Sequence, residues 1–572
     1  MGELGSLYIE GADCGDCSRC VRECVVKAIG VAGGTTAIDA GRCVGCGSCL
    51  ARCKAGYVQI RDDVYLARQY VRDFSIKVAS VSPLWVTEFP GLDMSRLVEA
   101  LKLLGFTHVS ESALGAEKVL ECELEMIRTR RGLNISSRCP AVVSYLRKYR
   151  PQLCERVMPL ESPMIAHARM IRSWWGAEAR TIHISPCVAA KDEAAAHPDL
   201  VELALTFTEL KRWLQNEGID FDHIQGSDSY QFEPFTARGG LLYPLEGGMV
   251  TDRLLSSDEF RGVQGLYRSS LDRIDELLSV MPDLDTGDLF LDLMACPGGC
   301  VGSNGATQHK ISYIDRRNLL MREAASRTRI DQSYRLPYIH TDTPPVVPDA
   351  VADFVPETDT LRALDSLGIR TEAEQIDCNG CGYVTCRRFA KALARGVVDR
   401  RMCTRFVHRE MQSKFMTLIT KLSSGVMVVD ERLRIVESNR TFAAMMGPDI
   451  ELLYDATPGL AGVDTADIVP FYHLLVSVLE SAEETAVRDV QIKERILTVS
   501  VHTVQPHKML LVICRNMLFS QVRNEEIISR TQRVIRENLE TVQKIAYLLG
   551  ENASRTEAIL NSILDSQSVD NE

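Results

Sequence analysis

Cysteines are the residues of this chain whose type and spacing point most directly to chemistry. Nineteen are present, and near the start eight of them form two runs with the same C-x2-C-x2-C-x3-C spacing. Three thiolates at such intervals can wrap one face of a [4Fe-4S] cube, while the fourth lies on the following helix and reaches a second cube. The runs therefore predict two clusters, bound by Cys14, Cys17, Cys20 and Cys53 and by Cys43, Cys46, Cys49 and Cys24.

Zinc is the alternative ligand of these two runs. A structural zinc site typically uses two separated pairs of cysteines, so two runs of four favour iron-sulfur clusters. A disulfide framework would suit a short secreted chain with different cysteine spacing. Residues 1–65 resemble a two-cluster bacterial ferredoxin, although Val25 and Lys54 replace the proline that usually follows each fourth cysteine.

Four further cysteines lie in the middle of the chain, at strand ends or in glycine-rich loops. Between residues 66 and 343, apolar strand-like runs alternate with amphipathic segments, which predicts an α/β domain. A structural cysteine is usually an isolated thiol on an apolar face, whereas these adjoin prolines or glycines. Thiolates from three loops can together hold one more cube. The four are Cys139, Cys187, Cys296 and Cys300.

The segments around these cysteines, SSRCP, SPCVAAK and MACPGGC, resemble three signatures of the [FeFe] hydrogenases, which read TSCCP, MPCxxKK and MACxxGC. The resemblance implies that the four thiolates bind a [4Fe-4S] cube. It also implies that Cys300 bridges to a two-iron subsite bearing CO, cyanide and an azadithiolate, where H2 is split or formed. Met294 and Pro83 match family residues that pack beside that subsite.

Several positions depart from the family pattern. Ala190 stands where the family has a lysine that holds a cyanide, and Lys191 follows one place later. Ser185 replaces a methionine, and Met164 replaces a glutamine that contacts the second cyanide. Arg138 replaces the cysteine that relays protons. A guanidinium stays protonated, so it can donate a hydrogen bond or tune charge but does not readily pass a proton on. This departure from the family pattern predicts a hydrogenase of low turnover.

Three alternating glutamates, Glu121, Glu123 and Glu125, lie near where the family places its relay carboxylates. On a helix, such a pattern is more typical of a solvated face than of a relay. We therefore expect a solvated face and keep the relay as the alternative.

A third cysteine motif lies in residues 344–412. A proline-rich linker at 344–358 precedes Cys378, Cys381, Cys386 and Cys403, whose C-x2-C-x4-C-x16-C spacing resembles a four-cysteine [4Fe-4S] module of redox and corrinoid proteins. Spacing alone leaves zinc open as the bound metal.

The C-terminal part contains no further cysteine cluster. In residues 413–516, two strands joined by a turn and followed by Asn439 before a helix resemble the opening of a PAS domain. Residues 517–572 repeat apolar residues at helical spacing, which predicts helices for dimerisation or partner docking. Because no kinase, phosphatase or DNA-binding motif is found, a signal would pass to a downstream signalling protein.

Length and charge narrow the class of protein. At 572 residues the chain is long enough for several domains, and a net charge of −12 argues against nucleic-acid binding. We see neither an apolar run long enough for a membrane span nor a signal peptide, so we expect a cytoplasmic protein. The predicted fold is multidomain α/β and α+β: ferredoxin-like domain, hydrogenase domain, small iron-sulfur module, PAS domain and C-terminal helices.

Three functions compete. The first is a sensory [FeFe] hydrogenase that slowly interconverts H2 with protons and electrons and signals through the PAS domain. The second is a catalytic hydrogenase that exchanges electrons with ferredoxin or another redox partner. The third is an iron-sulfur protein without the two-iron subsite. A homodimer is compatible with each of them.

Overall fold

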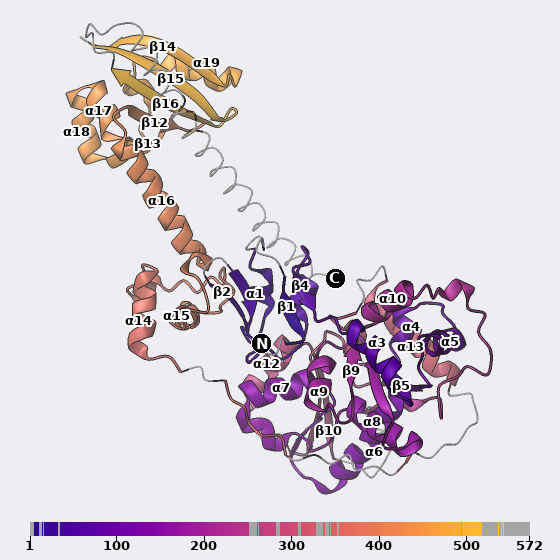
Figure 1. Ribbon diagram of the computed structural model, residues 1–572. Helices are drawn as coiled ribbons and strands as arrows, with labels where there is room; N and C mark the ends of the chain where they lie inside the picture. Colours follow the sequence, from indigo (N-terminus) through magenta and orange to yellow (C-terminus); the bar gives the residue numbers. More distant parts are fainter. Residues whose placement is uncertain are drawn as a thin grey trace. The chain divides into compact units, whose positions relative to one another are not determined.

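The computed structural model describes the chain from residue 5 to residue 516, with short gaps, and three later residues (Figure 1). The gaps are 11–13, 15–16, 33–34, 251–259, 261, 282–286, 307–310, 328–335, 338–342, 344, 352–353 and 493–494; the later residues are 536, 539 and 542. The chain divides into two compact units, 1–406 and 407–572. All three cysteine motifs fall in the first unit. The predicted C-terminal helices lie outside the described residues, apart from the three named.

The N-terminal part consists of two small antiparallel strand pairs and two short helices, consistent with the predicted small cluster domain. β1 pairs with β4 and β2 with β3. Ser18 and Gly47 adopt the left-handed conformation immediately before the helices, which turns the chain so that Cys20 and Cys49 fall in the first helical turn. The elements are β1 (Leu7–Ile9), α1 (Arg19–Glu23), β2 (Ile29–Ala32), β3 (Thr35–Ile38), α2 (Ser48–Arg52) and β4 (Val58–Ile60).

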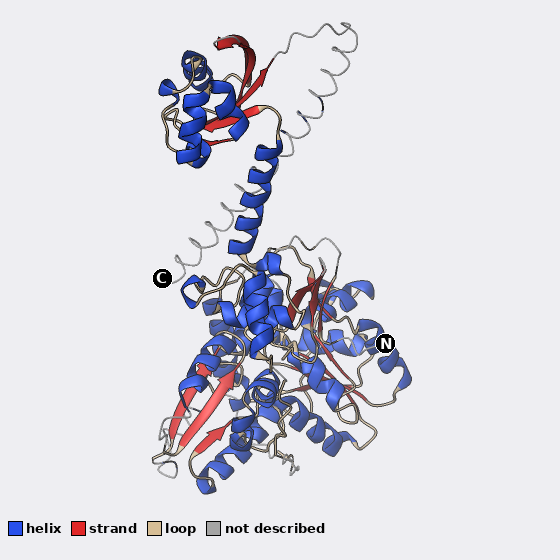
Figure 2. Ribbon diagram, turned by 90° about the vertical axis from the view of Figure 1, so that its left-hand side faces the viewer, coloured by secondary structure: helices blue, strands red, loops and turns tan. Residues whose placement is uncertain are grey.

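Two all-parallel sheets form the centre of the first unit, with helices packed around them (Figure 2). One has the order β6-β5-β8-β9 and the other β10-β11-β7. Parallel strands covered on both faces are mostly apolar, and all six residues of β11 are buried, Asp292 among them. This confirms the predicted α/β architecture. The strands are β5 (Lys77–Val81), β6 (His108–Glu111), β7 (Leu133–Ile135), β8 (Arg180–Ile184), β9 (Leu203–Leu205), β10 (Gln264–Ser269) and β11 (Leu289–Met294).

The helices of this part begin with recognisable caps. The Ser162 side chain accepts a hydrogen bond at the start of α8, and Thr206 forms a capping box with Glu209 at the start of α10. The helices are α3 (Val64–Asp73), α4 (Trp85–Glu88), α5 (Met94–Leu103), α6 (Ala113–Thr129), α7 (Pro140–Tyr149), α8 (Pro163–Trp175), α9 (Ala189–Ala196), α10 (Phe207–Asn216), α12 (Leu271–Val280) and α13 (Tyr313–Arg327).

The third cysteine motif folds as a small helical module on the N-terminal part. Its α14 (Glu357–Ser366) and α15 (Cys386–Ala394) share one hydrophobic core with β2 and α1, and the Val31 amide donates to the Val397 carbonyl at 3.0 Å. Helix α16 (Thr404–Lys421) follows the last cysteine of the module.

The second unit contains a five-stranded antiparallel sheet of order β13-β12-β16-β15-β14 with a core of its own. Asn439 is fully buried and links its parts: its carbonyl oxygen accepts from Val426 and Phe442, and its amide donates to Ile419 in α16. The elements are β12 (Gly425–Val429), β13 (Ile435–Ser438), α17 (Arg440–Met446), α18 (Pro448–Ala456), α19 (Tyr472–Ser481), β14 (Thr485–Ile492), β15 (Arg495–Gln505) and β16 (Met509–Asn516).

Among the helices that the structure describes, none has the length and apolar character needed to cross a bilayer.

Candidate metal centre

Four cysteines from three loops line one cavity in the middle of the first unit. Cys139 follows β7, Cys187 follows β8, and Cys296 and Cys300 follow β11. The carboxyl ends of parallel strands are where α/β folds bind ligands, and these loops meet there. The cavity encloses about 920 Å³ of atom-free space, including its open mouth.

The chemistry of this donor set fits a cationic cluster. Burial, followed by the neighbouring thiols, raises the pKa of Cys187 and Cys300 well above the ordinary value and that of Cys296 to about 12. Burial likewise raises the pKa of Cys139. Thiolates are the form that binds metal, and four of them around one cavity are unfavourable unless positive charge accompanies them. Iron bound among them would supply that charge.

In the described part of the chain, no group of three or more His, Cys, Asp or Glu side chains is arranged as the ligands of a single metal ion. In a [4Fe-4S] cube each of the four cysteines binds a different iron, so its thiolates need not converge on one point.

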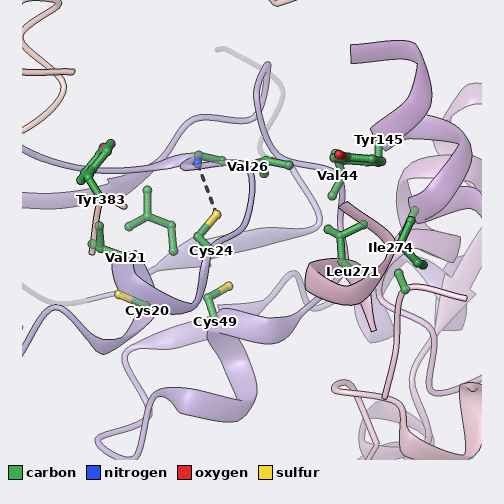
Figure 3. Close-up of a cluster of buried hydrophobic side chains, with 14 of the residues drawn as sticks. Cys20, Val21, Cys24, Val26, Val44, Cys49, Tyr145, Leu271, Ile274 and Tyr383 are labelled. Atoms are coloured by element: carbon green, nitrogen blue, oxygen red, sulfur yellow. Dashed lines mark hydrogen bonds between the residues drawn. The ribbon is translucent and has the colours of Figure 1, made fainter. Parts of the chain in front are cut away.

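The neighbours of two N-terminal cysteines are compatible with the two crossed sets that their spacing predicts, and the ligand sets stay a prediction. The thiols that act electrostatically on Cys20 are Cys14, Cys17 and Cys53. Those that act most strongly on Cys49 are Cys46, Cys43 and Cys24. Backbone amides also point at the sulfurs: Ala28 donates to Cys24 at 3.3 Å, drawn in Figure 3, and Gly45 donates to Cys43 at 3.4 Å.

The second of these sets reaches the central cavity. Gly45 and Cys46 themselves line it. The Asn304 side-chain amide, from the loop after Cys300, donates to the Cys46 carbonyl at 3.0 Å. The N-terminal part of the chain thus contributes to the cavity wall.

The third set lines a separate cavity of about 320 Å³, walled by Tyr383, Phe389 and other apolar side chains. Its four thiols are Cys378, Cys381, Cys386 and Cys403. Gly382 adopts a positive φ of 83°, and a Cβ there would stand 2.9 Å from the Arg22 Cα. The cysteine loop therefore packs directly on α1.

Most of the predicted neighbours of the two-iron subsite lie in the central cavity wall. Met164, Ser185, Ala190 and Met294 line it. Pro83 is buried but is not among the lining residues; its neighbours Ser82 and Leu84 are.

Lys191 requires a correction, because the structure places it outside the cavity wall. Its side chain is 1% exposed, and its ammonium donates to Asp63 at 2.8 Å, Glu209 at 2.9 Å and the Ala204 carbonyl at 2.9 Å. Successive residues of a helix differ by about 100° in direction. Ala190 therefore faces the cavity while Lys191 faces away, which contradicts a catalytic role at the subsite.

Arg138 lies in the cavity wall within a buried ion-pair network. Its guanidinium contacts Asp292 at 2.9 Å and Glu123 at 3.3 Å and donates to Ser136 at 3.1 Å. Burial raises the pKa of both carboxyls, with Arg138 opposing the shift. The guanidinium therefore stays protonated and remains paired with Glu123, Asp292 and Ser136.

The expected solvated face is wrong for Glu123, which is fully buried. Glu121 and Glu125 are exposed. Residues two apart on a helix point about 200° apart, so the middle glutamate turns inward while its neighbours turn outward.

Sequence reasoning missed several polar groups of the cavity wall, among them His183, Glu193 and Tyr243. Glu193 had a signal, since it lies one helical turn after Ala190 and therefore on the same face of α9. Burial raises its pKa to about 7. Tyr243 follows a short 3-10 turn, and no periodicity pointed to it.

Comparison with known proteins agrees with this geometry. Residues 75–304 match the family described as iron only hydrogenase large subunit, C-terminal domain. This central part of the chain is therefore similar to the [FeFe] hydrogenases. Residues 374–405 match a family described as a putative Fe-S cluster.

Its relatives are distant. The chain is 21% identical over 417 residues to the NADP-reducing hydrogenase subunit HndD of Solidesulfovibrio fructosivorans, an alignment covering 59% of this chain and 71% of that protein. It is 24% identical over 261 residues to the periplasmic [Fe] hydrogenase large subunit of Nitratidesulfovibrio vulgaris, covering 37% of this chain and 62% of that one, less than two thirds of its length.

The solved structures that the chain resembles also have low sequence identity to it. An [FeFe]-hydrogenase studied for oxygen inactivation of its H cluster is 18% identical, with a TM-score of 0.38, and covers 51% of this chain and 100% of its own. A PAS domain of an HTR-like protein from Haloarcula marismortui is 16% identical, with a TM-score of 0.15, and covers 19% of this chain and 95% of its own.

The third cysteine set gives a direct test of iron against zinc. In anaerobically reconstituted full-length chain, Cys381→Ser should carry about four fewer iron atoms than the unsubstituted chain, because one [4Fe-4S] cube is lost. Metal analysis and sulfide content measure this. Unchanged iron with loss of one zinc would show that the module binds zinc.

Removing Arg138 should destabilise the first unit. Arg138→Met leaves Glu123 and Asp292 buried without a cation, which costs about 3–5 kcal/mol. Since burial raises the pKa of both carboxyls in the folded state, their protonation favours folding, and the destabilisation should shrink as the pH is lowered. Thermal unfolding of the variant across pH measures this. The matched control is Arg138→Met with Glu123→Gln and Asp292→Asn, which should regain stability; equal loss in both variants at every pH would contradict the account.

Proposed function

We propose that the chain is a sensory [FeFe] hydrogenase. It binds H2, interconverts it slowly with protons and electrons (H2 ⇌ 2H⁺ + 2e⁻), and passes H2 or redox state to a partner protein. One observation carries the proposal: the cavity keeps four thiols and Met294, whereas the position of the relay cysteine holds Arg138 in a buried ion-pair network. A site that keeps its ligands without that exchangeable proton suits detection better than flux.

The residues present fit the group that the family implies. Cys139, Cys187 and Cys296 would hold a [4Fe-4S] cube together with Cys300, which would also hold the two-iron subsite with its CO, cyanide and azadithiolate. Bound there, this group supplies the H2 chemistry and takes up the electrons. Met164 and Met294 narrow the cavity with apolar atoms and limit water. Arg138 orients Glu123 and Asp292 but retains its own proton.

A series of thiol sets supports an electron route through the first unit. Cys46 links the second ferredoxin-type set to the central cavity. The Lys27 ammonium lies near both the second and the third thiol set, since Cys24 and Cys381 both act on it electrostatically. It stands 5.6 Å from the centre of the Tyr383 ring and donates to the carbonyls of Val21 and Arg22, both at 3.1 Å.

The start of α16 supports a signalling route. This helix begins at Thr404, immediately after the cluster ligand proposed at Cys403, and Ile419 near its end is bonded to Asn439 of the PAS-like sheet. A change of charge at the third set would therefore act on a helix that continues toward the PAS-like part. We propose that this part, with the C-terminal segment, docks a downstream signalling protein in a reducing cytoplasm, where free thiols persist.

A catalytic, ferredoxin-linked hydrogenase is the second candidate. It is favoured by the exposure of Cys17 and Cys378, which brings two cluster sets to the surface, where a redox partner could exchange electrons. Turnover on the order of 10²–10³ per second in the matured protein would support this candidate over a sensor.

Restoring the relay thiol should raise turnover. In the matured chain, Arg138→Cys supplies an exchangeable proton beside the cavity and frees Glu123, and general acid-base groups contribute about 10²-fold or more to rate. H2 evolution per cluster-loaded molecule measures this. Arg138→Met is the matched control, because it breaks the ion pairs without adding a relay, and should not accelerate. Equal rates for Arg138→Cys and the unsubstituted chain would contradict a block at this position.

Sensing should be visible as a change in the protein outside the cavity. Hydrogen exchange of the matured full-length chain, with and without H2, should differ in α16 and the PAS-like sheet. The same comparison in Cys300→Ala, which would lack the two-iron subsite, should show no H2-dependent difference. Identical exchange with and without H2 in the unsubstituted chain would favour the catalytic alternative.

A further inference from the structure

Helix α9 contacts three different parts of the first unit through three consecutive residues. Ala190 lines the central cavity, and Lys191 binds the buried acidic pair Asp63 and Glu209. Asp192 binds the ferredoxin-like part, accepting from the Ser6 amide at 3.0 Å and from its hydroxyl at 2.8 Å. The side of the helix that faces away from the cavity therefore contacts the N-terminal part of the chain, through Lys191 with Asp63 and through Asp192 with Ser6.

Lys191 anchors the point where the chain leaves the ferredoxin-like part. Asp63 directly precedes α3, its amide donates to Glu209 at 2.8 Å, and its carboxylate also pairs with Arg61 at 3.0 Å. Two carboxylates thus face one ammonium and one guanidinium, so the charges balance. An ammonium has three donors, and Asp63, Glu209 and the Ala204 carbonyl accept all of them.

The first turn of α9 lies against the loop that carries the second ferredoxin-type set. Gly45, with a φ of 69°, comes so close that a Cβ would stand 3.1 Å from the Ala189 Cα and 3.1 Å from the Asp192 carboxylate. Cys46 follows Gly45 and lines the cavity. The position of this loop, and of its thiols, therefore depends on the position of α9.

We propose that Lys191 and Asp192 form a clamp that positions the second ferredoxin-type thiol set against the central cavity. Lys191 stands one place after the position where the family has the lysine that holds a cyanide. Because neighbouring residues of a helix differ by about 100° in direction, its side chain points to Asp63 and Glu209 and not into the cavity. The inference rests on the proposed function in one respect, namely that both thiol sets hold clusters. Lys191 is thus a positioning residue for electron entry and does not touch the reacting group.

The test uses full-length chain reconstituted with iron and sulfide, so that neither maturation nor H2 turnover is needed. Electron paramagnetic resonance of the reduced chain reports the magnetic interaction between neighbouring clusters, and a redox titration gives their midpoint potentials. Lys191→Met should weaken the interaction and shift the potential of the cluster bound by Cys43, Cys46 and Cys49. In the same Lys191→Met variant, the cluster bound by the third cysteine set should keep its midpoint potential. The signal of that cluster is identified as the one that disappears in Cys381→Ser.

Two further variants keep the test decisive. If Lys191→Met fails to fold, Asp192→Asn, which weakens the contact with Ser6 at a more exposed position, should give the same change to a smaller degree. Glu178→Gln, an exposed carboxylate beyond the end of α8, is the control and should change nothing. Folded, fully loaded clamp variants with unchanged interaction and potentials would overturn the inference alone, whereas absence of cluster signals from the unsubstituted chain would overturn the proposed function.

Discussion

The structure depends on the convergence of half-buried thiols at the carboxyl ends of parallel strands. Short loops after β7, β8 and β11 bring Cys139, Cys187, Cys296 and Cys300 to one cavity. Burial raises the pKa of each thiol, so the anionic form required for metal binding is unfavourable in the bare protein. Bound iron would reverse that balance, and the fold and the cluster would then stabilise each other.

A buried ion-pair network forms part of the wall of this cavity. The buried carboxylates of Glu123 and Asp292 are neutralised by Arg138. A buried pair of this kind is expensive to break because each remaining charge would lack a partner. The ion pairs that stabilise the cavity wall therefore also hold the proton of the Arg138 guanidinium in place. Under the proposed function, the stability of the cavity wall and slow turnover would share this physical origin.

Local spacing predicted much of this arrangement. The α/β architecture could be inferred because strand periodicity is a local property of the sequence. Ligand spacing is also local, and it predicted which cysteines to group together. Met164, Ser185, Ala190 and Met294, predicted as neighbours of the two-iron subsite, line the same cavity as the four central cysteines. The directions of Lys191 and Glu123 were missed, because they depend on which side of a helix meets the rest of the protein. Tyr243 was missed because it comes from an irregular segment distant in sequence from the cysteines.

The central claim is that the four thiols hold an iron cube to which a two-iron unit bearing CO and cyanide is attached. The infrared spectrum of the matured protein tests it most directly, because no group native to a polypeptide absorbs where iron-bound CO and cyanide do. The account predicts bands from both ligands, and their loss in Cys300→Ala. A matured protein that carries its full complement of iron-sulfur clusters and shows neither band would contradict it.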